Sequence, residues 1–319
     1  MYYITKLESA IFETPYQEGY RKLKVLSGYA SSAFLTHILS NYPDLSLELI
    51  IGMACKDGIT EWDHKRYRQI VSNNPQVDIK YQRSLPAVHS KIYHWYQNDE
   101  FDTNEAFIGS SNFSWAGFRD QMELMGKVDY PNLPEVFRCT DTVSCLHENV
   151  EDEIRINQLE VEKRDDGSIG LYSVEGNKIE LGELDFVKLS LLTKSGEEIH
   201  ERGGLNWGQR EGREPNQAYI PVPVSINRDK ENFFPPFKHT FTLLTDDGEQ
   251  MSCIMAQDNR KAIQTTDSNS ILGRYFRQRL NIPLGSKVNM TDLEKYGRTH
   301  VTIYKLNNET YFMDFGVPV

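Results

Sequence analysis

The sequence predicts two domains: an α/β domain and, after it, a mainly-β barrel that carries one short helix. With 319 residues, the chain is long enough to bury two cores of ordinary size. Strand-like and helix-like segments alternate in the first half, which is the pattern of α/β proteins. Later segments are short and strand-like and are separated by Gly, Pro and Asn, which is typical of a barrel. We place the first domain at residues 1–157, an acidic linker at 158–182 and the second domain at 183–319.

Hydrophobic periodicity predicts the individual elements. In the first domain it predicts helices at residues 32–39, 60–73 and 143–156. Strands are predicted there at residues 23–29, 45–51, 77–81, 88–95, 106–109 and 122–128. In the second domain strands are predicted at residues 186–192, 218–224, 239–244, 250–255, 300–304 and 310–314. One clear helix interrupts them at residues 270–280, and Asp267 or Ser268 is available as its N-cap.

The composition is that of an ordinary globular protein, with 39% hydrophobic and 25% charged residues. No apolar run approaches the length of a membrane span, and residues 1–18 lack the basic and apolar segments of a secretory signal. We therefore expect a cytoplasmic bacterial protein with no membrane partner. The scattered cysteines have no His at zinc spacing, so we expect no metal and no cofactor. These cysteines are Cys55, Cys139, Cys145 and Cys253.

Negative charge is concentrated in the first domain and the linker. Residues 1–182 hold 18 Lys and Arg against 28 Asp and Glu, whereas residues 183–319 hold 17 against 18. The stretch 148–180 alone has ten acids and four bases. The simpler interpretation of this stretch is a solvated surface. The alternative is that it mimics phosphate and covers a cationic site until DNA displaces it.

One strand and one turn carry residues suited to phosphodiester chemistry. In a predicted strand, His89 and Lys91 project to the same face, so an imidazole and an ammonium can converge on one phosphate. The turn Gly-Ser-Ser-Asn at residues 109–112 adds Ser110 and Asn112 as neutral donors. A phosphodiester needs a nucleophile, charge neutralisation and an acid for the leaving oxygen. These residues supply all three without a metal.

This pattern resembles the phospholipase D superfamily, whose motif runs His-x-Lys, a spacer and Gly-Ser-x-Asn. Here the spacer holds seventeen residues. Nucleases of that superfamily place an acidic residue eleven positions after the motif Asn to orient the histidine, and this position is Glu123. The superfamily's Asp five residues after the motif Lys is replaced by Tyr96, which weakens the lipid-enzyme interpretation more than the nuclease one. Ser27 and Tyr29, at the end of the first predicted strand, are expected to line the same site.

The resemblance also implies a second subunit. Phospholipase D chemistry uses two His-x-Lys units, and this chain has only one. We expect a homodimer through the nuclease domain, with one composite site on its two-fold axis. In that site one His89 forms a phosphohistidine and its mate acts as acid and then as base. Glu123 is expected to fix the imidazole tautomer.

Two polar segments of the second domain, residues 203–213 and 257–264, are rich in Arg, Gln and Asn, the side chains that pair with guanine and adenine. Exposed loops without a function would look the same. The order of these segments, and the run Asn-Phe-Phe-Pro-Pro at residues 232–236, resemble the B3-type DNA-binding pseudobarrel of NgoFVII-type and BfiI-type restriction endonucleases. That resemblance implies DNA-binding roles for Asn206, Trp207, Gln209, Arg210, Arg213, Gln257, Asn259, Arg260 and Lys261. Phe233, Phe234 and Phe237 are expected in the barrel core, and Arg277 either reaches a phosphate or is solvated.

The sequence therefore predicts a sequence-specific endonuclease that cuts double-stranded DNA without a metal. One alternative is a nuclease subunit of an NTP-dependent restriction complex. The chain has no Gly-x-x-x-x-Gly-Lys-Ser/Thr loop, so a separate NTPase or helicase partner would supply the ATPase. A less favoured alternative is a phospholipase D-type lipid phosphodiesterase. The His89, Lys91, Asn112 and Glu123 set argues against a protein that only binds DNA.

Overall fold

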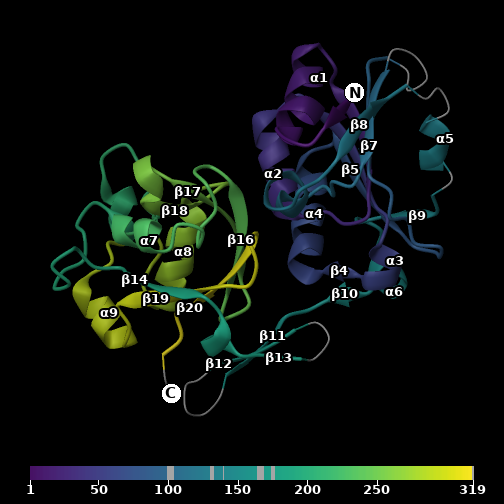
Figure 1. Cartoon of the computed structure of the whole chain (residues 1–319). Coiled ribbons are helices and arrows are strands. Elements are labelled where there is room, and N and C mark those ends of the chain that lie inside the picture. The colour runs from purple at the N-terminus through teal and green to yellow at the C-terminus, as the bar shows by residue number, and fades with distance from the viewer. Residues whose placement is uncertain (99–103, 130–132, 139, 164–168, 174–176, 318–319) are drawn as a thin grey trace. The chain divides into compact units, whose positions relative to one another are not determined.

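A computed structural model gives the fold of residues 1–98, 104–129, 133–138, 140–163, 169–173 and 177–317. The chain divides into two compact units, Met1–Gln158 and Leu159–Val319, each with its own core (Figure 1). In the described residues, no helix is both long enough and apolar enough to cross a membrane.

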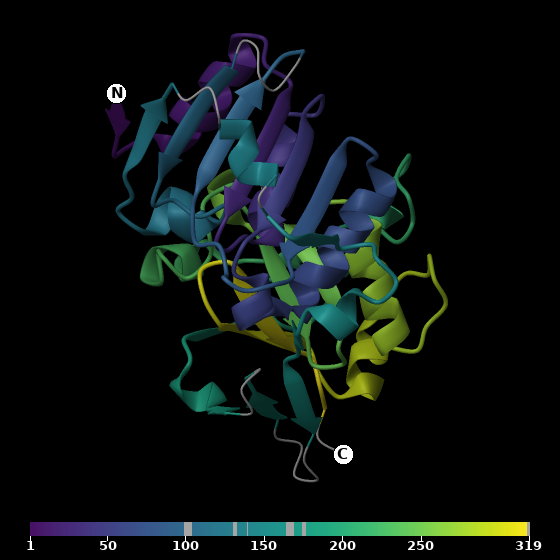
Figure 2. The ribbon, with the colours of Figure 1, turned by 90° about the vertical axis from the view of Figure 1, so that its right-hand side faces the viewer.

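The first unit is built on an eight-stranded sheet with the order β1-β8-β7-β6-β2-β3-β5-β9. Strands β2, β3 and β5 run parallel, and the other pairings are antiparallel. Figure 2 shows several of these strands side by side. Their bounds are β1 Tyr2–Tyr3, β2 Lys22–Ser27, β3 Ser46–Ile51, β5 Val77–Gln82, β6 Ile92–Tyr96, β7 Asn104–Gly109, β8 Met125–Val128 and β9 Thr142–Ser144. A two-stranded parallel pair, β4 Ile59–Thr60 and β10 Ile156–Asn157, lies outside this sheet.

Helices cover both faces of this sheet (Figure 1). On one face α2 and α4 pack around buried aromatic rings such as Phe12, Phe34 and Phe113. Ser31 caps α2 and Thr60 caps α4 through side-chain oxygens that accept backbone N–H groups. On the other face α5 packs Phe137 over the sheet. The helices are α1 Thr14–Gln17, α2 Ser32–Asn41, α3 Ala54–Asp57, α4 Glu61–Asn73, α5 Leu133–Arg138 and α6 Val150–Glu153, with π-helical turns at Ser9–Glu13 and Ala116–Asp120.

Three predicted elements of the first unit are wrong in extent. The helix predicted at residues 143–156 is a strand, β9, followed by a turn and the four-residue helix α6. The β-branched residues of Thr142–Ser144 extend the sheet edge by pairing with β5, which outweighs the helical pattern. The motif strands begin at Ile92 and Met125 rather than at residues 88 and 122.

The second unit is a nearly closed barrel with the strand order β14-β19-β20-β16-β17-β18-β15. Its end strands β14 and β15 also lie in contact. Phe233 and Phe234 are buried in its core as predicted, whereas Phe237 is exposed against expectation. The strands are β14 Phe186–Ser190, β15 Ile220–Pro221, β16 Thr240–Thr245, β17 Gln250–Ala256, β18 Ala262–Thr265, β19 His300–Lys305 and β20 Thr310–Asp314.

The segment predicted as an acidic linker contains an antiparallel sheet of three short strands. These strands are β11 Glu160–Lys163, β12 Ile169–Tyr172 and β13 Lys178–Ile179. Residues 164–168 and 174–176 of the predicted linker lie outside the described residues.

The predicted helix of the barrel is α8, Ser270–Arg279, and its N-cap is Asn269 rather than Asp267 or Ser268. Two more helices were not predicted, α7 Val224–Asp229 and α9 Met290–Tyr296. Short 3₁₀ turns lie at Leu181–Glu183, Gly204–Gln209 and Asp258–Arg260.

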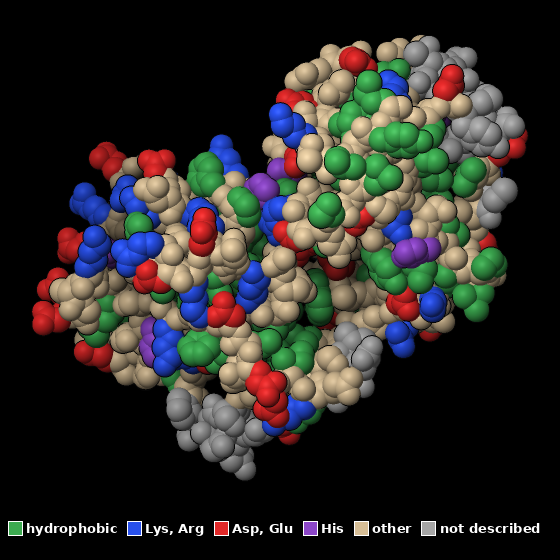
Figure 3. Space-filling model, viewed as in Figure 1, with side chains coloured by type: hydrophobic (Ala, Val, Ile, Leu, Met, Phe, Trp, Pro, Cys, Tyr) green, Lys and Arg blue, Asp and Glu red, His purple; other side chains and the backbone are tan. Residues whose placement is uncertain are grey.

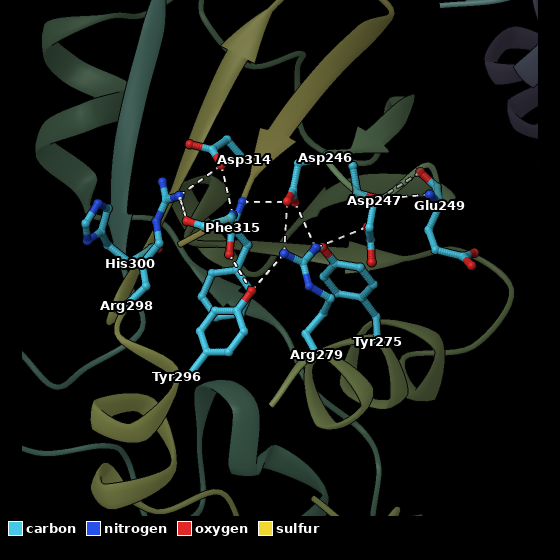
Figure 4. A network of polar contacts seen from close by, with 12 residues as sticks. Asp246, Asp247, Glu249, Tyr275, Arg279, Tyr296, Arg298, His300, Asp314 and Phe315 are labelled. Carbon is cyan, nitrogen blue, oxygen red and sulfur yellow. Dashed lines mark hydrogen bonds and ion pairs between the residues drawn. The ribbon is translucent and has the colours of Figure 1, made fainter. Parts of the chain in front are cut away.

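A buried ion pair ties α8 to the strand ends (Figure 4). Arg279 donates to both carboxylate oxygens of Asp246, at 2.8 and 2.9 Å, and the Asp246 side chain has no exposed surface. Asp246 also accepts the backbone N–H of Phe315, and Arg279 donates to the hydroxyl of Tyr296. The network therefore fixes α8 and α9 against the last strand of the barrel.

Candidate active site and DNA-binding surface

His89 and Lys91 lie on the segment that enters β6. Val88 donates its backbone N–H to Gly52, and Gly109 donates to the carbonyl of Lys91, so hydrogen bonds hold both ends of this segment. The Lys91 ammonium lies 3.1 and 3.2 Å from the two ring nitrogens of His89 and donates to the His89 carbonyl at 2.7 Å. The two side chains thus converge on one point. Both residues were predicted to lie in a strand, but they precede β6.

The side chains of His89 and Lys91 differ in their exposure. Lys91 is 6% exposed, whereas the imidazole of His89 is open to solvent. Burial lowers the pKa of Lys91, and the negative charge of Glu123 acts in the opposite direction. A partly dehydrated ammonium interacts more strongly with a phosphate than a solvated one. Lys91 is therefore suited to neutralise charge, and the exposed His89 to meet a substrate.

The amide of Asn112 is oriented by its neighbours. Its Oδ1 atom accepts the backbone N–H of Tyr29 at 3.1 Å. The buried hydroxyl of Ser27 lies 3.4 Å from the same oxygen and also accepts the backbone N–H of Phe113. Because the oxygen is engaged on this side, the NH₂ group of Asn112 is left to donate to an anion.

The turn that carries Asn112 is closely packed. A Cβ at position 109 would lie 2.0 Å from the carbonyl oxygen of Leu124, so only glycine fits there. Tyr93 donates its hydroxyl to the carbonyl of Ser111, and the Ser111 hydroxyl donates to Gly117. These buried hydrogen bonds from side chains to backbone carbonyls fix the turn beside His89.

The end of β2 forms the wall against which His89 rests. A Cβ at Gly28 would lie 2.8 Å from Cδ2 of His89, so the imidazole packs directly on this glycine. The Tyr29 ring meets the imidazole edge to face, with centroids 5.8 Å apart. The Tyr29 hydroxyl donates to Asp57 at 2.7 Å, which raises the Tyr29 pKa. Ser27 and Tyr29 line the site as predicted, but Gly28 and Asp57 were missed because their positions depend on the meeting of separate loops.

Glu123 has a different partner from the one expected. It accepts a hydrogen bond from the hydroxyl of Ser110, which also accepts the backbone N–H of Leu124. Glu123 is half-buried beside the exposed Met122 and Leu124, so it does not lie in a buried apolar strand. In the described residues Ser110 rather than His89 holds the carboxylate, and Glu123 acts on the site through its charge near Lys91. Among these residues no group of three His, Cys, Asp or Glu side chains could hold a metal.

Several residues expected to contact DNA instead hold the barrel together. Asn206 is fully buried and exchanges hydrogen bonds with the backbone of Val288. Arg277 is also fully buried, and its guanidinium donates to four backbone carbonyls, those of Leu205, Gly273, Pro215 and Ser286. The predictions that Asn206 contacts DNA and that Arg277 reaches a phosphate or is solvated are therefore wrong. Both side chains donate hydrogen bonds to buried backbone carbonyls of loops, which no helix or strand satisfies.

Gln209 and Arg260 also bind the protein itself. Gln209 donates to the carbonyls of Pro215 and Gly285, both at 3.1 Å. Arg260 donates to backbone carbonyls of the segment 231–235. In this conformation Nε2 of Gln209 and Nη1 of Arg260 are used in contacts within the protein, and the DNA-binding roles of both residues stay predictions.

The other expected DNA-binding residues have accessible side chains. The guanidinium of Arg213 stacks on Trp207 at 4.0 Å from the ring centroid. Arg210 is exposed and donates to the carbonyl of Arg202. Exposed positions in the second segment are Gln257, Asn259 and Lys261. Figure 3 shows basic side chains spread over the visible face of the second unit, with acidic ones among them.

A phospholipase D-type (PLD) nuclease domain followed by a B3-like DNA-binding barrel is the class of protein that this fold and site define. The model of the NgoFVII restriction endonuclease N-terminal PLD domain matches residues 5–155. The model of the NgoFVII C-terminal B3-like DNA-binding domain matches residues 181–307. The chain belongs to the NgoFVII family of restriction endonucleases.

Solved structures resemble parts of the chain at low identity. Nuc, a phospholipase D family member from Salmonella typhimurium, is 16% identical, with 37% of this chain and 73% of Nuc covered and a TM-score of 0.29. NucT from Helicobacter pylori is 13% identical, with 43% of this chain and 89% of NucT covered and a TM-score of 0.31. Polyphosphate kinase from Porphyromonas gingivalis is 14% identical over 56% of this chain, with a TM-score of 0.30, and the match spans 24% of the kinase. Comparison with curated protein sequences finds no match. The family assignment therefore rests on the two family models that match residues 5–155 and 181–307.

Proposed function

We propose that the protein is a type II restriction endonuclease that recognises double-stranded DNA through the barrel and cleaves it without a metal. The convergence of His89, Lys91 and Asn112 beside the end of β2 is the observation that carries this proposal. It joins an accessible nucleophile, a buried cation and an oriented amide donor at one point. The family's DNA-binding domain supplies the substrate class.

In the proposed reaction two copies of the chain share one site. A ring nitrogen of one His89 bonds to phosphorus while the bond from phosphorus to the leaving deoxyribose oxygen breaks. The protonated His89 of the second copy gives its proton to that oxygen. This second imidazole then takes a proton from water, whose oxygen attacks phosphorus and releases the first imidazole. Lys91 and Asn112 stabilise the added negative charge in both steps.

Exposed apolar side chains beside the site support docking of the second copy. Met122 and Leu124 flank Glu123 and are 99% and 48% exposed, and Ile108 on β7 is 42% exposed. Apolar side chains also gather on the face of the first unit shown in Figure 3. Contiguous exposed apolar surface is a feature of interaction sites. A second copy bound there would bring its own His89 close to the first.

Cleavage of plasmid DNA in EDTA, with and without ATP, tests the proposal. We expect discrete fragments in EDTA alone, and strict dependence on magnesium or ATP would contradict it. His89→Ala should abolish cleavage and leave DNA binding unchanged, whereas His147→Ala, at another exposed histidine, should cleave normally. Co-refolding equal amounts of wild type and His89→Ala tests the shared site. Random pairing leaves about a quarter of the dimers with two intact histidines, so activity should fall to about a quarter rather than to half.

A further inference from the structure

The turn between β17 and β18 has an unusual backbone. Gln257 has φ 60° and ψ 159°, Asn259 has φ 57° and ψ 28°, and Arg260 has φ 56°. Side chains with a Cβ rarely adopt positive φ, and the Gln257 conformation is one that glycine adopts far more readily. Three of the six non-glycine residues with positive φ in the described chain thus fall within four positions.

Two polar side chains, Arg260 from the turn itself and Asn227 from α7, tie this turn to its surroundings. The Arg260 guanidinium donates to the carbonyls of Glu231 and Phe234, both at 3.2 Å. The Asn227 amide, on α7, donates to the carbonyls of Asn259 and Arg260, both at 2.9 Å. Because Phe234 is buried in the barrel core, the Arg260 contact ties the turn to a rigid part of the fold.

The side chains that the turn presents are exposed polar groups. Gln257, Asn259 and Lys261 all face solvent. In the part of the chain that the structure describes, the Gln257 and Asn259 amides have no hydrogen-bond partner in the protein. These side chains therefore make no hydrogen bond on which the fold depends. Glycine would relieve the backbone at either position, and more at Gln257, because asparagine adopts the left-handed region more readily than most residues with a Cβ. A side-chain amide held in this way can pair with adenine through two hydrogen bonds, and a lysine can contact phosphate.

We propose that Arg260 and Asn227 are positioning residues that keep the turn 257–261 in a pre-formed conformation from which Gln257 and Asn259 read bases. The proposal rests on the proposed function, since it presumes sequence-specific DNA binding. It assigns Arg260 to the support of the turn rather than to a DNA contact. The positive-φ backbone of this turn costs free energy, and the Gln257 and Asn259 side chains make no hydrogen bond within the protein that would offset this cost. The cost is explained if the backbone sets the direction in which these two amides point toward DNA.

Binding to DNA in EDTA tests the role of the two amides, with the His89→Ala chain as the parent to prevent cleavage. The parent first selects its preferred sequence from a pool of random duplexes. The discrimination ratio is then the dissociation constant for the pool divided by that for the selected duplex. Gln257→Gly and Asn259→Gly should each raise the thermal midpoint and lower the discrimination ratio about 10-fold or more. Asn281→Gly, another exposed residue with φ 53°, is the matched control and should raise the midpoint while leaving discrimination unchanged.

The positioning role is tested with Arg260→Met and Asn227→Ala. Each should lower discrimination about 10-fold, change affinity for the pool less than about 2-fold and leave its salt dependence unchanged. Lys261→Met, in contrast, should weaken binding to every duplex and reduce the salt slope by about 1.

Two results would overturn the inference. One is wild-type discrimination in both glycine variants, and the other is a reduced salt slope in Arg260→Met. If the parent selects no sequence from the pool, the proposed function itself fails, and the role of the turn fails with it.

Discussion

Alanine at position 28 tests whether His89 sits where cleavage needs it. The new Cβ would lie 2.8 Å from Cδ2 of His89, a distance that real Cβ atoms essentially never show. The imidazole must move by about 0.6 Å to reach 3.4 Å, where ordinary van der Waals contact begins. Gly28 does not have a positive φ, so the backbone itself accepts alanine.

The size of the effect follows from this displacement. A misplacement of about 1 Å can lower the rate of an enzyme about 100-fold. We therefore expect Gly28→Ala to lower the cleavage rate about 10- to 100-fold, which is about 1.4–2.7 kcal/mol of activation free energy. The unfolding free energy should change by less than about 0.5 kcal/mol, because the exposed imidazole can swing into solvent.

Single-turnover cleavage of plasmid DNA in EDTA measures the effect, with DNA binding followed in parallel. Gly182→Ala is the control, since a Cβ there meets nothing within 4 Å, and it should cleave at the wild-type rate. A wild-type rate for Gly28→Ala would refute the placement of His89. A loss of DNA binding in this variant would also refute it, since the substitution would then act beyond the imidazole.

Three further predictions concern buried charges. Burial lowers the pKa of Lys91, so its ammonium loses its proton at a lower pH than a free lysine, whose pKa is about 10.4. The alkaline limb of the pH–rate profile should therefore lie below that pH, and Lys91→Arg, which stays charged, should lack this limb. Arg277→Met leaves four carbonyls without their donor and should lower the unfolding free energy by about 3 kcal/mol or more, measured by urea titration. Asp246→Asn breaks the buried pair with Arg279 and should cost about 3–5 kcal/mol in the same titration, and a cost under about 1 kcal/mol would contradict the buried geometry.

The helices and strands that the sequence predicted well are those whose own residues carry the signal. Helix α4 begins where Thr60 can cap it, and strand β3 alternates polar residues with buried leucines before it ends in Ile50 and Ile51. The helix predicted at residues 143–156 was wrong in its first part, because strand β9 forms only by pairing with β5. Such pairing between distant segments is not visible in a local pattern.

The candidate nuclease site was predictable in its residue types and not in its contacts. Motif spacing in the sequence identified His89, Lys91 and Asn112. It did not show that Glu123 pairs with Ser110, because both residues lie on loops whose meeting depends on the register of β7 and β8.

The sequence by itself determined the family, the two fold classes and the set of groups for phosphodiester chemistry, since all three depend on residue type and spacing. Only the tertiary structure decided which polar side chains face solvent. Asn206, Arg260 and Arg277 are of the residue types that read DNA. In the folded protein their side chains donate to backbone carbonyls of loops instead. A carbonyl that no strand or helix satisfies must find a donor inside the protein, and the sequence does not say where such carbonyls will be.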